Sequence, residues 1–163
     1  MDTRPYDAKT DTEALWALKE QFERGLGENT GGDDKQAVYD QKLTAAYRER
    51  YLGWVDRCIS EDPRSVTLAI SSVDDVVGYV FVLPESLSFI WDAAILNELY
   101  LHPAVRGSGA ADLLLDAAIE TARAQSLPLD RIVLDVDRKN DRAQAFYKKH
   151  GFEHWGEMVA RSL

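Results

Sequence analysis

Residues 96–114 read Leu-Asn-Glu-Leu-Tyr-Leu-His-Pro-Ala-Val-Arg-Gly-Ser-Gly-Ala-Ala-Asp-Leu-Leu, and this stretch decides the fold. The alternating side chains up to Leu101 predict a strand, which Pro103 ends. Beyond Gly109, apolar residues recur with helical spacing at positions 110, 113, 114, 117 and 118. Small residues fill the turn, so the backbone N–H groups that open the helix can approach a ligand closely. The stretch therefore predicts a strand, a tight turn and a helix whose N-terminus binds phosphate or another anion.

Two common phosphate-binding loops do not fit this turn. The P-loop requires a lysine followed by serine or threonine at the helix start, where this chain has small or acidic residues. The dinucleotide pattern G-x-G-x-x-G, started at Gly107, would need a glycine in place of Asp112. Too little chain follows for the βαβ units that this pattern also needs. The pattern that fits is Arg106-x-x-Gly109-x-Ala111 after an apolar strand.

A second motif follows downstream, after a helix and a strand at 131–137. Residues 140–152 read Asn-Asp-Arg-Ala-Gln-Ala-Phe-Tyr-Lys-Lys-His-Gly-Phe. Together the two motifs resemble the GNAT superfamily of acyl-CoA-dependent N-acetyltransferases, which carries Q/R-x-x-G-x-G/A and then N-x-x-A-x-x-F-Y-x-K-x-G-F. The order and spacing of the motifs agree as well. The resemblance is close over residues 93–153 and loose elsewhere.

The resemblance implies an α/β (α+β) fold, with a mixed sheet of about six or seven strands and about four flanking helices, in one domain over residues 1–163. The residues themselves predict an edge strand at 2–6 and antiparallel strands at 65–71 and 76–83. They also predict a helix capped by Thr10 or Asp11 and a second helix at 35–59, with a flexible acidic loop at 25–34 between them. Aromatic residues at 89–91 should be exposed. The strand at 131–137 should lie parallel to the strand that precedes the phosphate loop.

The C-terminus departs from the family pattern, in which two strands normally follow the Gly-Phe pair. Only residues 153–163 remain, too few for a hairpin with two long strands. Either one short strand turns at Gly156, or a single strand closes the sheet. An uncovered edge strand invites pairing with another chain. We therefore expect this edge to pair in a homodimer.

Composition narrows the function classes. The chain has 163 residues, of which 45% are hydrophobic and 29% charged, as in a soluble globular domain. It has neither an apolar run of about 20 residues nor a signal core, so we expect a cytoplasmic protein without a membrane partner. A net charge of −9 without a Lys/Arg cluster disfavours nucleic acid as a partner. The acidity either attracts cationic amines or only aids solubility. The single cysteine, Cys58, lies in an apolar helical pattern that favours packing.

The resemblance implies acetyl-CoA as cosubstrate and direct transfer of its acetyl group to a primary amine. A β-bulge near residues 99–101 would free a backbone N–H that polarises the acyl carbonyl. The implied cosubstrate contacts come from the strand, the loop and the last helix: Leu99, Tyr100, Leu101, Arg106, Gly107, Ser108, Gly109, Ala110, Ala111, Asn140, Ala143, Phe146 and Tyr147.

Two residues of the loop depart from the family pattern. Ser108 stands where members often have a basic residue, and Asp112 adds negative charge to the first helical turn. Both should weaken the attraction for pyrophosphate. Arg106 could compensate for this loss by binding the 3′-phosphate of the cosubstrate, together with Arg138, Lys139 or Arg142.

Two residues are candidates for proton transfer. The resemblance places Tyr147 at the sulfur of the cosubstrate, where a phenol can protonate the leaving thiolate. Glu98 lies in an otherwise apolar strand beside the implied reaction centre, so it is either the base, an anion that orients the substrate, or a residue paired with an arginine. Asp135 and Asp137 are the alternative bases, while His102 suits a turn. The remaining histidines, His150 and His154, lack metal-ligand spacing, so we predict no metal.

The predicted function is an N-acetyltransferase that acts on a primary amine, carried either by a small cationic molecule or by a protein. The alternative is an inactive module that senses acyl-CoA. The presence of both Tyr147 and Glu98 favours the enzyme. The resemblance places the acceptor region at residues 25–34, 47–54 and 89–91. The aromatics and carboxylates there suit a cationic amine but also suit plain packing.

Overall fold

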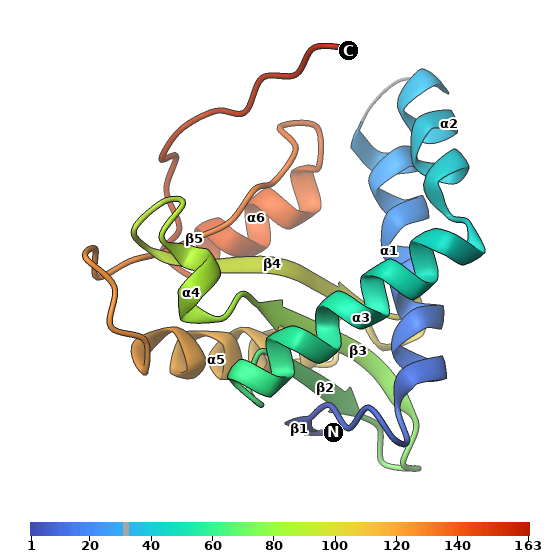
Figure 1. Ribbon diagram of the computed structural model, residues 1–163, viewed down its shortest axis with the longest axis vertical. Helices are drawn as coiled ribbons and strands as arrows, with labels where there is room; N and C mark the ends of the chain where they lie inside the picture. The colour runs from blue at the N-terminus through green and yellow to red at the C-terminus, as the bar shows by residue number, and fades with distance from the viewer. Residues whose placement is uncertain (31–32) are drawn as a thin grey trace.

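The computed structural model describes residues 1–30 and 33–163, and a five-stranded mixed sheet forms its centre (Figure 1). The strands lie in chain order across the sheet: β1 (Asp2–Pro5), β2 (Val66–Ile70), β3 (Val76–Val82), β4 (Ala94–Leu101) and β5 (Ile132–Val133). The first four pair antiparallel, and β5 pairs parallel with β4. The predicted mixed sheet is confirmed, but the described residues form fewer strands than the six or seven expected.

Helices cover both faces of this sheet. The described residues form six α-helices and one 3-10 helix: α1 (Thr12–Thr30), α2 (Asp33–Lys42), α3 (Ala45–Glu61), α4 (Glu85–Ser88), α5 (Ala110–Arg123), α6 (Asp141–Lys149) and the 3-10 helix η1 (Pro103–Val105). Figure 1 shows α1 and α3 on one face and α5 on the other. None of the helices in the described ranges is long and apolar enough to span a membrane.

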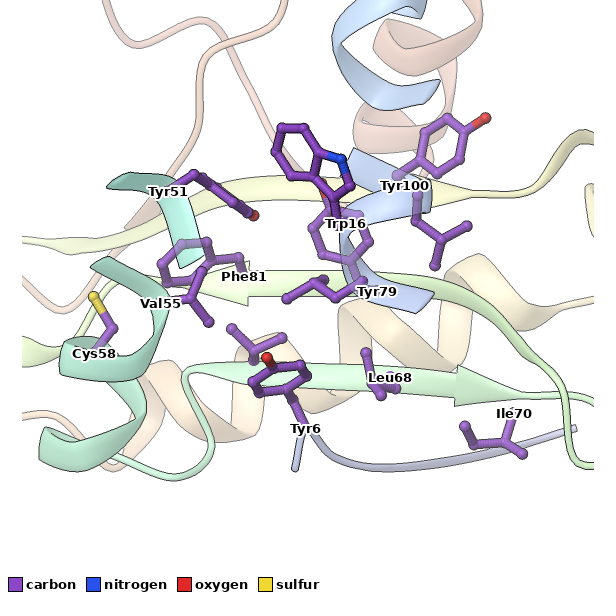
Figure 2. Close-up of a cluster of buried hydrophobic side chains, with 13 residues drawn as sticks. Tyr6, Trp16, Tyr51, Val55, Cys58, Leu68, Ile70, Tyr79, Phe81 and Tyr100 are labelled. Atoms are coloured by element: carbon purple, nitrogen blue, oxygen red, sulfur yellow. The ribbon is translucent and has the colours of Figure 1, made fainter. Parts of the chain in front are cut away.

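Each face of the sheet buries its own apolar cluster. Under α1 and α3, the buried cluster includes Trp16 and Tyr51 of the helices and Leu68, Tyr79 and Phe81 of the sheet (Figure 2). The opposite cluster lies under α5 and includes aliphatic side chains from β3, β4 and α5: Val80, Leu96, Leu101, Leu114 and Leu115. Phe146 and Phe152 pack against this second cluster, so α6 lies on the same side as α5.

The apolar stripe of α5 is offset from the predicted one. Leu113, predicted to face the core, is 40% exposed, and Leu115 is fully buried instead. The helix starts at Ala110, and its buried residues follow at 114, 115 and 118. That spacing is one stripe of an α-helix, and Leu113 lies at its margin.

The N-terminal half is more helical than the sequence predicted. The acidic loop predicted at 25–34 is wrong in the described part, because 25–30 continue α1 and α2 begins at Asp33; residues 31 and 32 lie outside the described residues. The single helix predicted at 35–59 is broken after Lys42. Thr44 caps α3 by accepting a hydrogen bond of 3.1 Å from the backbone N–H of Tyr47. A capping threonine satisfies N–H groups that a continuous helix would not leave open.

The C-terminal segment 153–163 forms no strand, so both strand arrangements predicted for it are wrong. Its residues are exposed, and side chains rather than a backbone ladder hold it. The Arg131 guanidinium lies 4.3 Å from the Trp155 ring centroid, and Arg138 pairs with Glu157 at 2.8 Å. The predicted homodimer stays a prediction.

Two further predictions are confirmed. β1 is an edge strand, and β2 and β3 form an antiparallel hairpin whose turn has Asp74 at a φ of 69°. Cys58 is buried in the cluster under α3, where burial raises the pKa of its thiol to about 11. At neutral pH this cysteine is a packing residue.

Candidate active site

One edge of β4 is uncovered along most of its length. β5 pairs only with Ala94 and Ile95, so on the side of β4 away from β3 no strand of the described residues pairs with it from Leu96 onward. The N–H of His102 donates to Val77 on the β3 side at 2.8 Å. Since successive residues of a strand alternate in direction, the N–H groups of Leu99 and Leu101 point toward the uncovered edge. These amides can hydrogen-bond an extended ligand arm.

The bulge in β4 lies at Asn97, two residues before the predicted position at 99–101. Glu98 pairs with Phe81, but Leu96 pairs with Val82, so Asn97 is the extra residue. Leu96 and Leu99 both pack on the α5 side although they are three apart. A regular strand would send them to opposite faces, and the bulge resolves this conflict.

The turn after β4 is open to solvent. Gly107 and Gly109 have φ values of 82° and 88°, a region that non-glycine residues rarely adopt. A Cβ atom at either glycine would meet nothing within 4 Å, so the backbone conformation, not crowding, requires them. The first α5 hydrogen bond runs from Leu113 N–H to Gly109 O, at 3.2 Å. The N–H groups of residues 110–112 therefore have no acceptor within the helix. Ala110 is buried, and the Ser108 hydroxyl donates to Val105 O at 2.7 Å.

Basic side chains surround this turn. Arg106 Nε donates to Leu101 O at 3.2 Å, and burial together with the charge of Arg106 lowers the pKa of Arg142. The like charges of the two guanidinium groups therefore act on each other, and neither pairs with a carboxylate within the described ranges. By contrast Arg138, another predicted phosphate contact, pairs with Glu157. Lys139 and Arg142, with Asn140 and Asp141, line a shallow pocket of about 190 Å³.

Asp112 is engaged with the end of α6. Its carboxylate lies 2.8 Å from His150 Nε2 and 3.2 Å from Lys149 Nζ. The hydrogen bond from Lys149 lowers the pKa of Asp112, with a further contribution from His150. The negative charge predicted to oppose phosphate is thus partly compensated by the neighbouring helix.

The start of α6 is organised by Asn140, whose side chain accepts a hydrogen bond of 3.2 Å from Ala143 N–H. Tyr147 follows two turns later and lies half-buried, with its ring 5.4 Å from that of Phe152. Burial raises the pKa of the Tyr147 phenol to about 12. Tyr147 therefore keeps its proton at neutral pH and can donate it.

Glu98 lies on the opposite side of the sheet from Tyr147's apolar neighbours and is only 5% exposed. Four groups donate to its carboxylate. Tyr51 and Tyr79 each donate to Oε2 at 2.8 Å, Lys19 donates to Oε1 at 2.5 Å, and Asn97 Nδ2 lies 3.4 Å from Oε1. Burial and the charge of Glu98 raise the pKa of both tyrosines well above the ordinary value. The carboxylate is paired with a lysine rather than with the arginine considered from the sequence.

Lys19 is the residue that the sequence reasoning missed. Its ammonium lies 2.5 Å from both Glu98 and Glu23, and it is 3% exposed. Burial works to lower the pKa of Lys19, but the two carboxylates outweigh burial and raise it. A signal was present, since Lys19 and Glu23 lie four apart on the apolar face of α1.

The alternative bases lie elsewhere. Asp137 pairs with Lys35 at 2.7 Å, which joins α2 to the connection before α6. Asp135 is exposed, outside the two-residue strand β5. His102 caps the 3-10 helix by accepting from Ala104 N–H at 3.3 Å, so its predicted turn role is confirmed.

The model of the Acetyltransferase (GNAT) family matches residues 15–152. The chain belongs to this family. An uncharacterized N-acetyltransferase of Mycobacterium tuberculosis is 36% identical over 123 residues, which are 75% of this chain and 69% of the relative. The peptidyl-lysine N-acetyltransferase YjaB of Salmonella typhimurium is 27% identical over 74% of this chain and 71% of its own. Members use acetyl-CoA, and this GNAT chain is an acetyl-CoA-dependent N-acetyltransferase.

Solved structures share the GNAT fold at low identity. The PaiA N-acetyltransferase of Thermoplasma acidophilum, in complex with coenzyme A, has a TM-score of 0.70 at 19% identity, covering 93% of this chain and 89% of its own. An aminoglycoside 6′-N-acetyltransferase of Acinetobacter haemolyticus has a TM-score of 0.62 at 18% identity, covering 100% of this chain and 98% of its own. The predicted GNAT fold is confirmed.

Proposed function

We propose that this GNAT enzyme transfers the acetyl group of acetyl-CoA directly to a primary amine carried by a cationic acceptor. We also propose that residues 1–163 form one domain, because both apolar clusters share the same sheet. The observation that carries the catalytic proposal is Tyr147, a half-buried phenol that keeps its proton on α6, the helix that also carries Arg142.

The residues present fit acetyl-CoA. The uncovered β4 edge offers the Leu99 and Leu101 amides to an extended arm, and the open glycine turn offers the first amides of α5 to a pyrophosphate. Arg106 and Arg142 supply positive charge beside both. We assign the remaining contacts to β4, the loop, the start of α5, and α6 with its N-cap: Tyr100, Gly107, Ser108, Gly109, Ala110, Ala111, Asn140, Ala143 and Phe146. The acetyl thioester supplies the electrophilic carbon.

Tyr147 acts as the general acid. As the amine nitrogen bonds to the acetyl carbon and the carbon–sulfur bond breaks, the sulfur becomes a thiolate that needs a proton. The Tyr147 hydroxyl donates that proton and regains one from solvent. The bulge at Asn97 supplies a distorted backbone beside the reacting carbonyl, and one donor aimed at its oxygen would contribute about 3 kcal/mol.

Glu98 accepts the proton of the amine in this proposal. Its four donors leave no open position, so one must give way first. The distance from Asn97 Nδ2 to Glu98 Oε1 is 3.4 Å, the longest of the four contacts, and Asn97 lies half-exposed at the bulge. Displacing the Asn97 amide opens Oε1, while Lys19, Tyr51 and Tyr79 keep the carboxylate in place. If no donor gives way, Glu98 instead orients the substrate.

A peptidyl lysine is the second candidate acceptor. The relationship to YjaB, named a peptidyl-lysine N-acetyltransferase, favours it. Lysine side chains and small alkyl amines present the same primary ammonium group. The acidic net charge of −9 attracts either kind of acceptor.

The test is a calorimetric titration of the purified protein with acetyl-CoA, followed by a thiol-release screen. The screen compares n-butylamine, spermidine, Nα-acetyl-lysine amide and a lysine-containing peptide in one buffer. Binding with thiol release supports the enzyme and ranks the acceptors. Binding without release from any amine would favour the acyl-CoA sensor, and absence of binding would overturn the assignment of the loop.

A further inference from the structure

Lys42, the last residue of α2, places its ammonium group in a polar and aromatic surrounding. Its Nζ lies 2.6 Å from Glu23 Oε2, 4.5 Å from the Tyr39 ring centroid and 5.4 Å from that of Tyr47. A carboxylate with two aromatic faces is the combination that recognises alkylammonium groups in proteins. The chain therefore contains a complete ammonium site and fills it with one of its own lysines.

Glu23 makes this site more than a surface ion pair. Its side chain is 2% exposed, and its Oε1 is taken by Lys19 at 2.5 Å. Within the described residues its buried Oε2 accepts no hydrogen bond of good geometry, although Lys42 lies beside it as an ion pair. Burial works to raise the pKa of Glu23, but Lys19 and Lys42 outweigh burial and lower it. The carboxylate is thus ionised and directed toward the position of the Lys42 ammonium.

The two lysines that contact Glu23 differ in how firmly they are held. Lys19 is 3% exposed and is enclosed by Glu23 and Glu98. The Lys42 side chain is 38% exposed and lies at a helix end, beside the break before Thr44. Lys42 can therefore leave the site by rotating its own side chain into water, without opening the core.

We propose that Glu23, Tyr39 and Tyr47 form a binding site for an alkylammonium group of the acceptor, and that Lys42 occupies this site as an internal stand-in until the acceptor displaces it. The site adjoins the catalytic network, because the single ammonium of Lys19 separates Glu23 from Glu98. The ion pair of Lys35 with Asp137 holds α2 against the connection that leads to the helix of Tyr147. The identity of the occupant as acceptor rests on the proposed function, but the binding of an ammonium group does not.

The experiment is rescue of Lys42→Ala by n-butylammonium chloride, which reproduces the chain and ammonium of a lysine side chain. The thermal midpoint is measured with rising n-butylammonium, with n-butanol as the neutral isostere and with sodium chloride at equal ionic strength. A ligand that binds only the folded state raises the midpoint, and we expect a rise about fivefold larger in the variant than in the wild type. The matched control is Lys9→Ala, which removes an exposed lysine on another segment and should respond as the wild type does.

Two further variants locate the binding. In Lys42→Ala/Glu23→Gln and in Lys42→Ala/Tyr39→Leu the rescue should be lost, because one removes the carboxylate and the other an aromatic face. The second is needed because Glu23 also pairs with Lys19, so its replacement can impair folding. An equal response in the wild type and Lys42→Ala, or rescue by n-butanol, would overturn the site.

Steady-state kinetics of Lys42→Ala distinguish a failure of the ammonium site from a failure of the proposed function. With a cationic acceptor, Lys42→Ala should lower KM several-fold while kcat changes little, because competition by the internal lysine is removed. Rescue by n-butylammonium in a protein without any turnover would uphold the site and reject the enzyme. Turnover with an unchanged KM and no rescue would uphold the enzyme and reject the site.

Discussion

Polar groups near β4 fall into two regions: in one they are buried and paired with each other, and in the other they lack such partners. On the side of α1 and α3, Glu98 has four donors and Lys19 lies between two carboxylates, all buried. At the uncovered edge of β4 and the start of α5, neither Arg106 nor Arg142 pairs with a carboxylate of the described residues, and the first amides of α5 have no acceptor within the helix. In the first arrangement each buried charge has a partner, so the loss of one partner would leave an uncompensated charge in the core. The second arrangement leaves polar groups available to bind the cosubstrate.

The largest expected effect is that of Lys19→Met, which removes the cation from the buried side. Two carboxylates would remain buried without their shared partner, and such losses destabilise proteins by about 3–5 kcal/mol. The free energy of unfolding, measured by urea denaturation at pH 7, should fall by that amount. Lys35→Met is the control, since its ion pair with Asp137 is partly exposed and should be worth at most about 1 kcal/mol.

The pH dependence sharpens this prediction. In the wild type, Glu23 has a lowered pKa, so its contribution is present above the unfolded pKa near 4.3 and is lost as the pH falls below it. Lys19 has a raised pKa, so its contribution is present below about 10.5 and is lost as the pH rises through the folded value. In Lys19→Met the deficit should shrink on acidification, because protonated carboxyls need no cation. A deficit that is constant from pH 7 to pH 4 would mean lost packing instead.

The next effect concerns the open side. Tyr147→Phe removes the proton donor while keeping the ring that packs on Phe152. We expect kcat to fall at least about 100-fold, the usual contribution of a general acid, with little change in the dissociation constant of acetyl-CoA. The measurements are steady-state thiol release and calorimetric titration. Tyr6→Phe is the control, because its hydroxyl pairs with Thr12 far along the chain from α6; an equal loss there would point to general destabilisation.

The same contrast explains what the sequence could predict. On the open side, the sequence correctly predicted a tight turn and a helix that begins just after Gly109, because small turn residues and helical spacing are local features of the chain. On the buried side, the sequence predicted only one of the two central charged residues. Glu98 was identified as unusual in an apolar strand, but its partner Lys19 lies 79 residues away. No local pattern specifies which charges meet across a folded core.

The errors have the same origin. The break at Thr44 was missed because a helix-compatible apolar stripe continues through it, and only the cap contact to Tyr47 reveals the turn. The bulge was misplaced because its position depends on which leucines of β4 reach the α5 face. The tail after residue 152 was expected to pair as a strand, yet in the structure only side-chain contacts hold it.

Replacing Gly109 by alanine tests the open turn by conformation alone. No atom would obstruct the new Cβ, so the cost comes from the positive φ of 88° and should be about 1–2 kcal/mol in unfolding free energy. A Cβ at Gly156 would also meet no atom within 4 Å, but Gly156 has no positive φ, so Gly156→Ala should leave the free energy of unfolding nearly unchanged. In β3, Gly78→Ala would destabilise by crowding, since its Cβ would lie 2.7 Å from Tyr100 O. Urea denaturation of the three variants compares the cost of a positive φ with the cost of crowding.

The smallest expected effect is that of Asp112→Asn at the N-terminus of α5. The substitution removes a negative charge from the helix end that we assign to pyrophosphate, and it leaves Lys149 and His150 uncompensated nearby. A charge near a helix terminus is worth about 0.3–1 kcal/mol, so acetyl-CoA should bind about two- to fivefold more tightly. Calorimetric titration at low and high salt measures the change, which should diminish as salt screens it. Weaker binding by the variant would instead mean that the contacts of Asp112 with α6 hold the open side in its binding conformation.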